Sequence, residues 1–109
     1  MTKLALVTGA SAGIGKETCT LFARNGYRVI ALSRQPTSVE SADLELALDL
    51  LSFEQIEGLA GTLETEIAAA ERVILVNNSG YGQFGALCDL SESMWQRQFS
   101  THVFGPIKL

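Results

Sequence analysis

The sequence predicts an α/β fold in which helices cover both faces of a parallel, doubly wound sheet. Short apolar runs without polar alternation recur along the chain, as in strands that are buried on both faces. They alternate with stretches whose apolar residues recur at helical spacing, and the connections between successive strands are long. With right-handed crossovers, four such strands take the spatial order 3-2-1-4.

The predicted elements follow in the order β-α-β-β-α-β-loop-α. The four strands are expected at Leu4–Val7, Tyr27–Leu32, Leu44–Leu48 and Arg72–Val76. A first helix begins at Gly13 and ends near residues 25–26, because Asn-Gly is a suitable helix end. Ser52 caps a second helix that reaches about residue 70, with Gln55 at capping-box spacing. Ser91 caps the last helix.

Length and composition predict one domain over residues 1–109 and exclude several classes of partner. A formal net charge of −4 and scattered basic residues argue against nucleic acid and anionic lipid. Cys19 and Cys88 lie far apart and the chain has one histidine, so neither a disulfide framework nor a metal site is expected. No apolar stretch is long enough for a membrane span or a signal peptide, which makes a cytoplasmic location the default expectation.

The stretch "LVTGASAGIGKE" leads from the first strand into the first helix and holds Gly9, Gly13 and Gly15. A glycine turn at a helix N-terminus gathers backbone N–H groups at the positive end of the helix, which suits a phosphate. The spacing differs from the GxGxxG of ordinary dinucleotide enzymes. Glycines before a helix also serve turns for conformational reasons, so the cluster alone does not decide between the two uses.

The residues after the second strand favour one cofactor. An acidic side chain there would bind the ribose 2′-hydroxyl of NAD, whereas a basic one would accept the 2′-phosphate of NADP. Ser33 and Arg34 occupy this place, and neither is acidic. We therefore expect NADP(H) rather than NAD(H), the alternative being that Arg34 is a solvated loop cation.

The motifs "TGASAGIG", "LDL" and "NNSG", in this order and at these separations, resemble the short-chain dehydrogenase/reductase family, particularly its NADP-preferring classical members. The resemblance implies a Rossmann-like fold and hydride transfer between nicotinamide and a small-molecule carbonyl or secondary alcohol. It implies a cofactor site made of Gly9, Ser11, Ala12, Gly13, Ile14 and Gly15 around the phosphates, Asp49 and the Leu50 backbone at the adenine, and Asn78, Ser79 and Gly80 under the adenosine ribose and toward the nicotinamide.

Four of the residues near these motifs have structural interpretations beside the functional ones. Asp49 can act simply as a strand terminator. Asn77 is expected to tie the central strands together through its amide rather than to touch substrate. Trp95 and Phe99 are expected in a core or an interface rather than in a substrate clamp.

The sequence departs from the family pattern in two places. His102 stands in "HVFGP" where the family has an asparagine that supports a proton relay. Imidazole can move protons near neutral pH, but a lone helical histidine is more often a packing or capping residue. The family's catalytic Ser and Tyr-x-x-x-Lys are also missing, since the residues four positions after Tyr27 and Tyr81 are Ala31 and Gly85.

These departures lead us to expect an N-terminal part of a dehydrogenase, which binds nucleotide and does not turn over by itself. The fourth strand would then form an open, apolar edge, and the chain would form a homo-oligomer through this edge or its helix faces. Two further interpretations stay open, namely a structural or regulatory fragment and a sugar-nucleotide epimerase of the family's extended branch. The "TGASAGIG" stretch fits the epimerase pattern less well.

Overall fold

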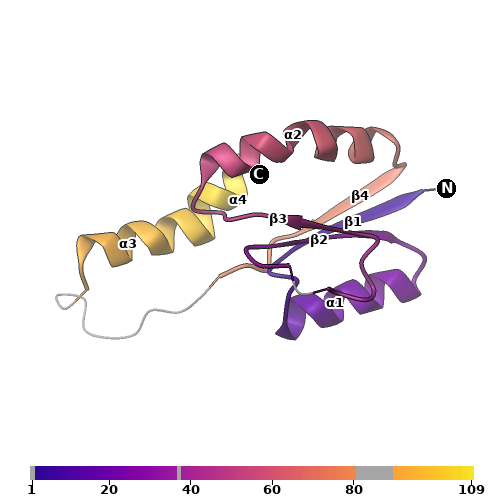
Figure 1. Ribbon diagram of the computed structural model, residues 1–109, viewed down its shortest axis with the longest axis horizontal. Helices are drawn as coiled ribbons and strands as arrows, with labels where there is room; N and C mark the ends of the chain where they lie inside the picture. Colours follow the sequence, from indigo (N-terminus) through magenta and orange to yellow (C-terminus); the bar gives the residue numbers. More distant parts are fainter. Residues whose placement is uncertain (1, 37, 81–89) are drawn as a thin grey trace.

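The computed structural model describes residues 2–36, 38–80 and 90–109, so Tyr81, Gly85 and Cys88 lie outside the described residues. The described strands form one parallel sheet in the order β3-β2-β1-β4, which confirms the predicted order. They are β1 (Lys3–Thr8), β2 (Arg28–Ser33), β3 (Leu44–Ala47) and β4 (Arg72–Val76). Figure 1 shows α1 (Gly13–Arg24) on one face of the sheet and α2 (Phe53–Ala68) on the other.

The strands supply two cores, one on each face of the sheet. The buried cluster on the α2 face contains Leu4, Leu6, Ile30, Leu32, Leu48, Leu50, Ile56 and Leu63. The cluster on the α1 face contains Val7, Ala10, Cys19, Val29, Ala31 and Val39. Since successive strand residues point to opposite faces, both faces of β1 and β2 are buried, which explains why their sequences show no polar alternation.

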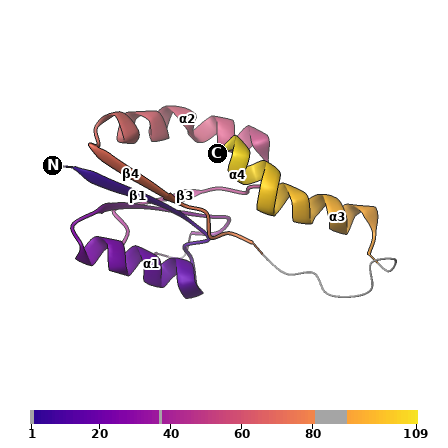
Figure 2. The same cartoon turned by 180° about the vertical axis from the view of Figure 1, so that it is seen from behind.

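The last helix begins as predicted after Ser91, whose Oγ accepts a hydrogen bond from the Met94 N–H at 3.3 Å. It consists of α3 (Glu92–Phe99), a π-helical turn (Ser100–Phe104) and α4 (Gly105–Lys108). In Figures 1 and 2, α3 extends away from the sheet whereas α4 lies beside α2. Lys108 Nζ lies 2.7 Å from Glu57 Oε1 of α2, so an ion pair joins the two helices. Among the described helices, none is both long and apolar enough to cross a membrane.

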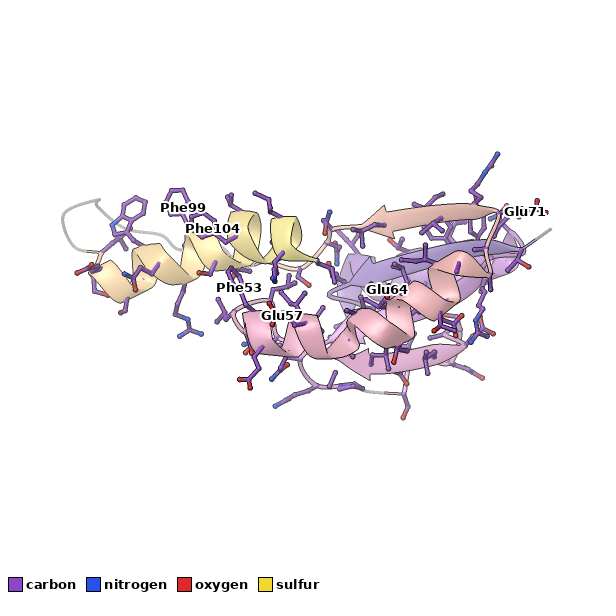
Figure 3. The ribbon with its side chains drawn as sticks, turned by 90° about the horizontal axis from the view of Figure 1, so that it is seen from above. Phe53, Glu57, Glu64, Glu71, Phe99 and Phe104 are labelled. Atoms are coloured by element: carbon purple, nitrogen blue, oxygen red, sulfur yellow. The ribbon has the colours of Figure 1, made fainter. Side chains whose placement is uncertain are left out.

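Two apolar surfaces remain exposed in the described part of the chain. β4 forms an edge of the sheet there, and its Val73 and Leu75 are more than a third exposed, as expected for an open apolar edge. Along the last helix, Trp95, Phe99 and Phe104 are also exposed, and Figure 3 shows the last two side by side. The ring centroid of Phe99 lies 6.3 Å from that of Trp95 and 6.3 Å from that of Phe104. A core position for Trp95 and Phe99 is therefore wrong for the described fold, and an interface position stays a prediction.

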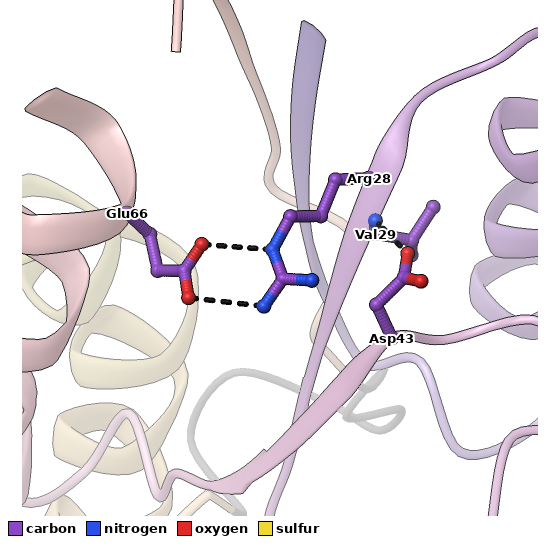
Figure 4. Close-up of polar contacts among 4 residues, drawn as sticks. All are labelled: Arg28, Val29, Asp43 and Glu66. Atoms are coloured by element: carbon purple, nitrogen blue, oxygen red, sulfur yellow. Dashed lines mark hydrogen bonds and ion pairs between the residues drawn. The ribbon is translucent and has the colours of Figure 1, made fainter. Parts of the chain in front are cut away.

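Polar contacts fix the start of β2 (Figure 4). Arg28 donates from Nε and Nη2 to the two carboxylate oxygens of Glu66, at 2.8 and 3.0 Å, and so joins β2 to α2. The Val29 N–H donates to Asp43 Oδ2 at 2.8 Å, and the Asp43 N–H donates to the Val29 carbonyl oxygen at 2.9 Å. These two hydrogen bonds fix the chain at Asp43, the residue directly before β3, and so place β3 beside β2.

The Arg28–Glu66 pair predicts a small, pH-dependent contribution to stability. The hydrogen bond from Arg28 holds the pKa of Glu66 below its usual value of 4.5, so the pair stabilises the fold above that pH. This contribution is lost as the pH falls through the lower folded-state pKa. We expect Glu66→Gln to lower the free energy of unfolding by at most about 1 kcal/mol near neutral pH, because the pair is partly exposed.

Urea unfolding at neutral and at acidic pH measures this effect. The difference between the wild type and Glu66→Gln should shrink as the pH falls below about 4.5. Glu64→Gln, on the same helix, is the control and should change stability by no more than a few tenths of a kcal/mol at either pH. If Glu66→Gln lowered the free energy of unfolding equally at neutral and at acidic pH, the pair would make no ionic contribution.

Candidate cofactor-binding site

The three glycines after β1 serve different purposes. Gly9 and Gly13 have φ values of 64° and 58°, a left-handed conformation that side chains disfavour. Gly15 lies in the first turn of α1, where an added Cβ would collide with the Gly9 carbonyl oxygen and stand 2.7 Å from Asn78 Nδ2. A Cβ at Gly13 would meet nothing within 4 Å, so the space outside the turn is open. Gly9 and Gly13 thus provide the left-handed conformation of the turn, Gly15 allows the helix to pack closely against it, and the outer side of the turn at Gly13 is open.

The N-terminus of α1 suits an anion. Its N-cap residue, Ala12, offers no side-chain hydrogen bond, and the first turn contains no acidic residue. Since the first N–H groups of a helix lack acceptors within the helix, they remain available at the positive end of the helix dipole. Ile14, in the same turn, is 78% exposed. This arrangement has the donor chemistry that a phosphate needs.

Thr8, the last residue of β1, joins the glycine turn to the "NNSG" segment. Its hydroxyl donates to the Val76 carbonyl oxygen at 3.3 Å and accepts from the backbone N–H groups of Asn78 and Ser79, at 3.0 and 3.1 Å. Asn78 Nδ2 also donates to the Gly9 carbonyl oxygen at 3.3 Å. The tie predicted for Asn77 is therefore made by Thr8 and Asn78 instead, because the second residue after β4, not the first, returns over the end of β1.

Our sequence reasoning missed Thr8 as part of this site. The signal was present, since a hydroxyl in an otherwise apolar buried strand must find hydrogen-bond partners. Thr8 is 1% exposed. Its position directly before Gly9 places those partners at the candidate site.

Removing the Thr8 hydroxyl should loosen the fold at this place. Thr8→Val keeps the shape of the side chain but leaves the N–H groups of Asn78 and Ser79 without their acceptor, so we expect a loss of about 1–3 kcal/mol of unfolding free energy. Thr8→Ser, which keeps the hydroxyl, should lose clearly less. Thermal unfolding of both variants tests this, and a loss for Thr8→Val no greater than that for Thr8→Ser would contradict the role of the hydroxyl.

A cleft of about 900 Å³ opens at the carboxyl ends of the strands, the place where ligands bind in open parallel sheets. It brings together residues from the glycine turn, from the ends of β2 and β3 and from the segment after β4. The predicted residues that line it are Gly9, Ser11, Ser33, Arg34, Asp49, Leu50, Ser79 and Gly80. Residues from distant parts of the sequence thus face a single space.

The other predicted residues lie beside this cleft or outside it. Ala12, Gly13 and Ile14 are exposed at the start of α1, while Gly15 and Asn78 are packed beneath the turn. His102 does not line the cleft: its ring lies over Gly80, where an added Cβ would collide with it, and it borders a separate groove of about 280 Å³. This contact favours the packing interpretation of His102, and its part in a proton relay stays a prediction.

Asp49 has the strand-ending role predicted for it, and its role at the adenine stays a prediction. Its carboxylate accepts a hydrogen bond from the Leu51 N–H at 2.9 Å, which forms a turn and ends the strand region, and it also lines the cleft. Ser52 caps α2 as predicted, by accepting from the Gln55 N–H at 3.2 Å. The side chain of Gln55 reaches back past Ser52, however, and accepts from the Asp49 N–H at 2.9 Å. The cap of α2 therefore also holds the wall of the cleft.

The last helix supplies a wall that sequence reasoning did not predict. Arg97 and Thr101 line the cleft on this side. Gly105 sets their position, because it lies against Leu50 so closely that a Cβ would stand 2.6 Å from the Leu50 carbonyl oxygen. No local pattern specifies where this helix docks, so only the structure reveals the contribution.

Comparison with known proteins identifies the family. Residues 3–109 match the sequence model of the family described as short chain dehydrogenase. The chain belongs to this family. Among curated relatives, the Escherichia coli oxidoreductase YbbO is 33% identical over all of this chain and 42% of its own length. The NADPH-dependent 1-acyldihydroxyacetone phosphate reductase of Saccharomyces cerevisiae is 30% identical over 98% of this chain and 39% of its own length. The chain thus spans about two fifths of the length of these short-chain dehydrogenase relatives.

Solved structures agree in fold and differ in cofactor. L-sorbose reductase from Gluconobacter frateurii, complexed with NADPH and L-sorbose, has a TM-score of 0.85 and 28% identity over 99% of this chain and 44% of that chain. A 4-hydroxyisoleucine dehydrogenase complexed with NADH has a TM-score of 0.84 at 24% identity, over 98% of this chain and 46% of that chain. At that identity the likeness shows the fold alone. The Rossmann-like architecture is therefore shared with proteins that bind either nicotinamide cofactor.

Proposed function

We propose that this chain is the cofactor-binding part of an NADP-dependent short-chain dehydrogenase. The observation that carries the proposal is that Ser33 and Arg34 line the same cleft as the glycine turn, with no acidic residue at the end of β2. A guanidinium at this place can bind a phosphate, whereas a carboxylate there would accept a hydrogen bond from a ribose hydroxyl. The NADPH in the names of the yeast reductase and the sorbose reductase complex supports the same choice.

The residues of the cleft fit the parts of a dinucleotide. The glycine turn and the start of α1 offer backbone N–H groups to the pyrophosphate, and Ser11 lines the cleft beside them. Asp49 and Leu50 would hold the adenine, while Ser79 and Gly80 would lie along the ribose and toward the nicotinamide. The bound nicotinamide supplies or accepts the hydride, and in the whole protein the partner is a small-molecule carbonyl or secondary alcohol.

The chain described here binds and orients the cofactor and, in this proposal, does not complete the reaction by itself. The family's Ser and Tyr-x-x-x-Lys have no counterpart in its sequence, so no side chain is assigned the proton transfer to the substrate oxygen. If the chain both bound the cofactor and reduced a substrate, a further residue would have to transfer the proton to the substrate oxygen.

Fluorescence titration of the purified protein with NADPH and then NADH tests the proposal. We expect saturable NADPH binding at least about tenfold tighter than NADH binding, because the 2′-phosphate adds a charge-assisted contact. No oxidation of NADPH should follow on addition of simple aldehydes or ketones. Equal affinity for the two cofactors would contradict the NADP assignment, and turnover would contradict the assignment as a binding part.

The exposed apolar surfaces favour an additional proposal, that the chain forms a homo-oligomer with a second copy as the partner. Trp95, Phe99 and Phe104 give the last helix an exposed aromatic surface, and β4 leaves an open strand edge in the described part of the sheet. Sedimentation velocity at micromolar concentration should show a dimer or larger species. Phe99→Asp should shift it toward monomer, whereas Leu21→Asp, at an exposed leucine of α1, should not. A monodisperse wild-type monomer would contradict this proposal.

A further inference from the structure

The wall of the cleft formed by the last helix has no role in the proposed function, and Arg97 is part of that wall. It lies on α3, and Thr101, four residues later, lines the cleft as well. Four-residue spacing places two side chains on the same side of a helix, so both belong to a single helix face that borders the cleft. The contact of Gly105 with Leu50 anchors this face against the loop that follows β3.

The place of this wall indicates which part of a cofactor it would meet. In the proposed function, Asp49 and Leu50 hold the adenine, and Arg97 and Thr101 line the same cleft. The helix that carries Arg97 and Thr101 touches Leu50 through Gly105. Arg34 enters from the end of β2, which is a different wall. We therefore assign the wall that carries Arg97 to the predicted base, because its helix is anchored at Leu50 rather than at the glycine turn.

The chemistry of the side chain suits a base. A guanidinium is planar, weakly hydrated and able to stack on aromatic faces, and nucleic-acid-binding proteins use arginine planes to stack on bases. In the described part of the chain, no carboxylate forms an ion pair with Arg97. Its planar group is thus available to a ligand in the cleft.

We propose that Arg97 recognises adenine by covering the face of the base with its guanidinium plane. This inference rests on the proposed function, since it requires a dinucleotide in the cleft. Arg34 and Arg97 then have separate tasks: Arg34 reads the 2′-phosphate and so distinguishes NADP from NAD, while Arg97 reads the base that the two cofactors share. The two arginines should therefore differ in which ligands they affect.

Isothermal titration calorimetry with cofactor fragments separates these tasks. The probes are 5′-AMP, which carries the base without a 2′-phosphate, and 2′,5′-ADP, which carries both. We expect Arg97→Ala to weaken the binding of both probes by a similar factor of about ten, as the loss of a stacked cation would. Arg97→Lys should not restore the affinity, because lysine keeps the charge but lacks the plane. Far-UV circular dichroism confirms that each variant is folded.

Each remaining outcome decides the question. Unchanged 5′-AMP binding in Arg97→Ala, full rescue by Arg97→Lys, or a loss confined to 2′,5′-ADP would overturn the assignment of Arg97 to the base. Failure of the proposed function looks different, because the wild type itself would then bind neither fragment or would not prefer 2′,5′-ADP. If the wild type bound both fragments without preference, Arg34→Ala would leave the ratio of the two affinities unchanged.

Discussion

Gly15→Ala should lower the free energy of unfolding by about 2 kcal/mol and abolish measurable nucleotide binding. The added Cβ would collide with the Gly9 carbonyl oxygen and stand 2.8 Å from the Gly9 carbonyl carbon. Both atoms belong to the backbone, so the glycine turn would have to move as a whole and the N–H groups of α1 would move with it. Thermal unfolding and NADPH titration measure the two effects.

Gly58→Ala provides a matched control for this change. Gly58 also lies in a helix, but a Cβ there would meet nothing within 4 Å. Because alanine is the better helix former, this substitution should raise the free energy of unfolding by about 0.5–1 kcal/mol and leave nucleotide binding intact. If Gly15→Ala behaved like Gly58→Ala, the close packing of α1 under the glycine turn would be wrong.

Arg34→Ala should weaken NADPH binding by about 10- to 100-fold and leave NADH binding within about twofold of the wild type. The physical reason is that the guanidinium would contact only the 2′-phosphate, which NADH lacks. Arg34→Lys should recover part of the NADPH affinity, since an ammonium keeps the charge but loses the bidentate geometry. Fluorescence titration with both cofactors gives the four affinities directly.

Arg72→Ala is the control for a general effect of charge. Arg72 is an exposed arginine that begins β4, at the opposite end of the strands from the cleft. Its removal makes the same change in net charge as Arg34→Ala and should leave both cofactors unaffected. An equal loss of NADPH and NADH affinity in Arg34→Ala would mean that Arg34 does not distinguish the cofactors.

The sheet was predictable because its strands are encoded locally. The predicted strand Arg72–Val76 has the same bounds in the structure. Where a bound of another strand differs from the prediction, it differs by one residue. Uninterrupted apolar residues indicated burial on both faces, and the handedness of crossovers then left a single order. Strand ends are less certain from sequence because hydrogen bonding to neighbours, rather than residue type, decides where pairing stops.

The candidate site was predictable only where a motif carries its own geometry. The glycines at positions 9, 13 and 15 signal a turn and a helix start, and the structure places them there. Thr8 and Asn78 work through contacts across about 70 positions, and the sequence-based choice of Asn77 was one residue early. Arg97 reaches the cleft through the docking of the last helix, in which Gly105 packs on Leu50, a tertiary contact that no local pattern encodes.

Amide chemical shifts provide the most direct test of the central claim, that the cleft at the carboxyl ends of the strands holds NADP(H). In a ¹⁵N-labelled sample titrated with NADP⁺, the largest changes should occur at the backbone amides of Gly13, Arg34 and Leu50. The amide of Arg72, at the opposite end of the sheet, should stay within experimental error. Changes confined to the groove beside Trp95, or no changes at saturating NADP⁺, would contradict the account.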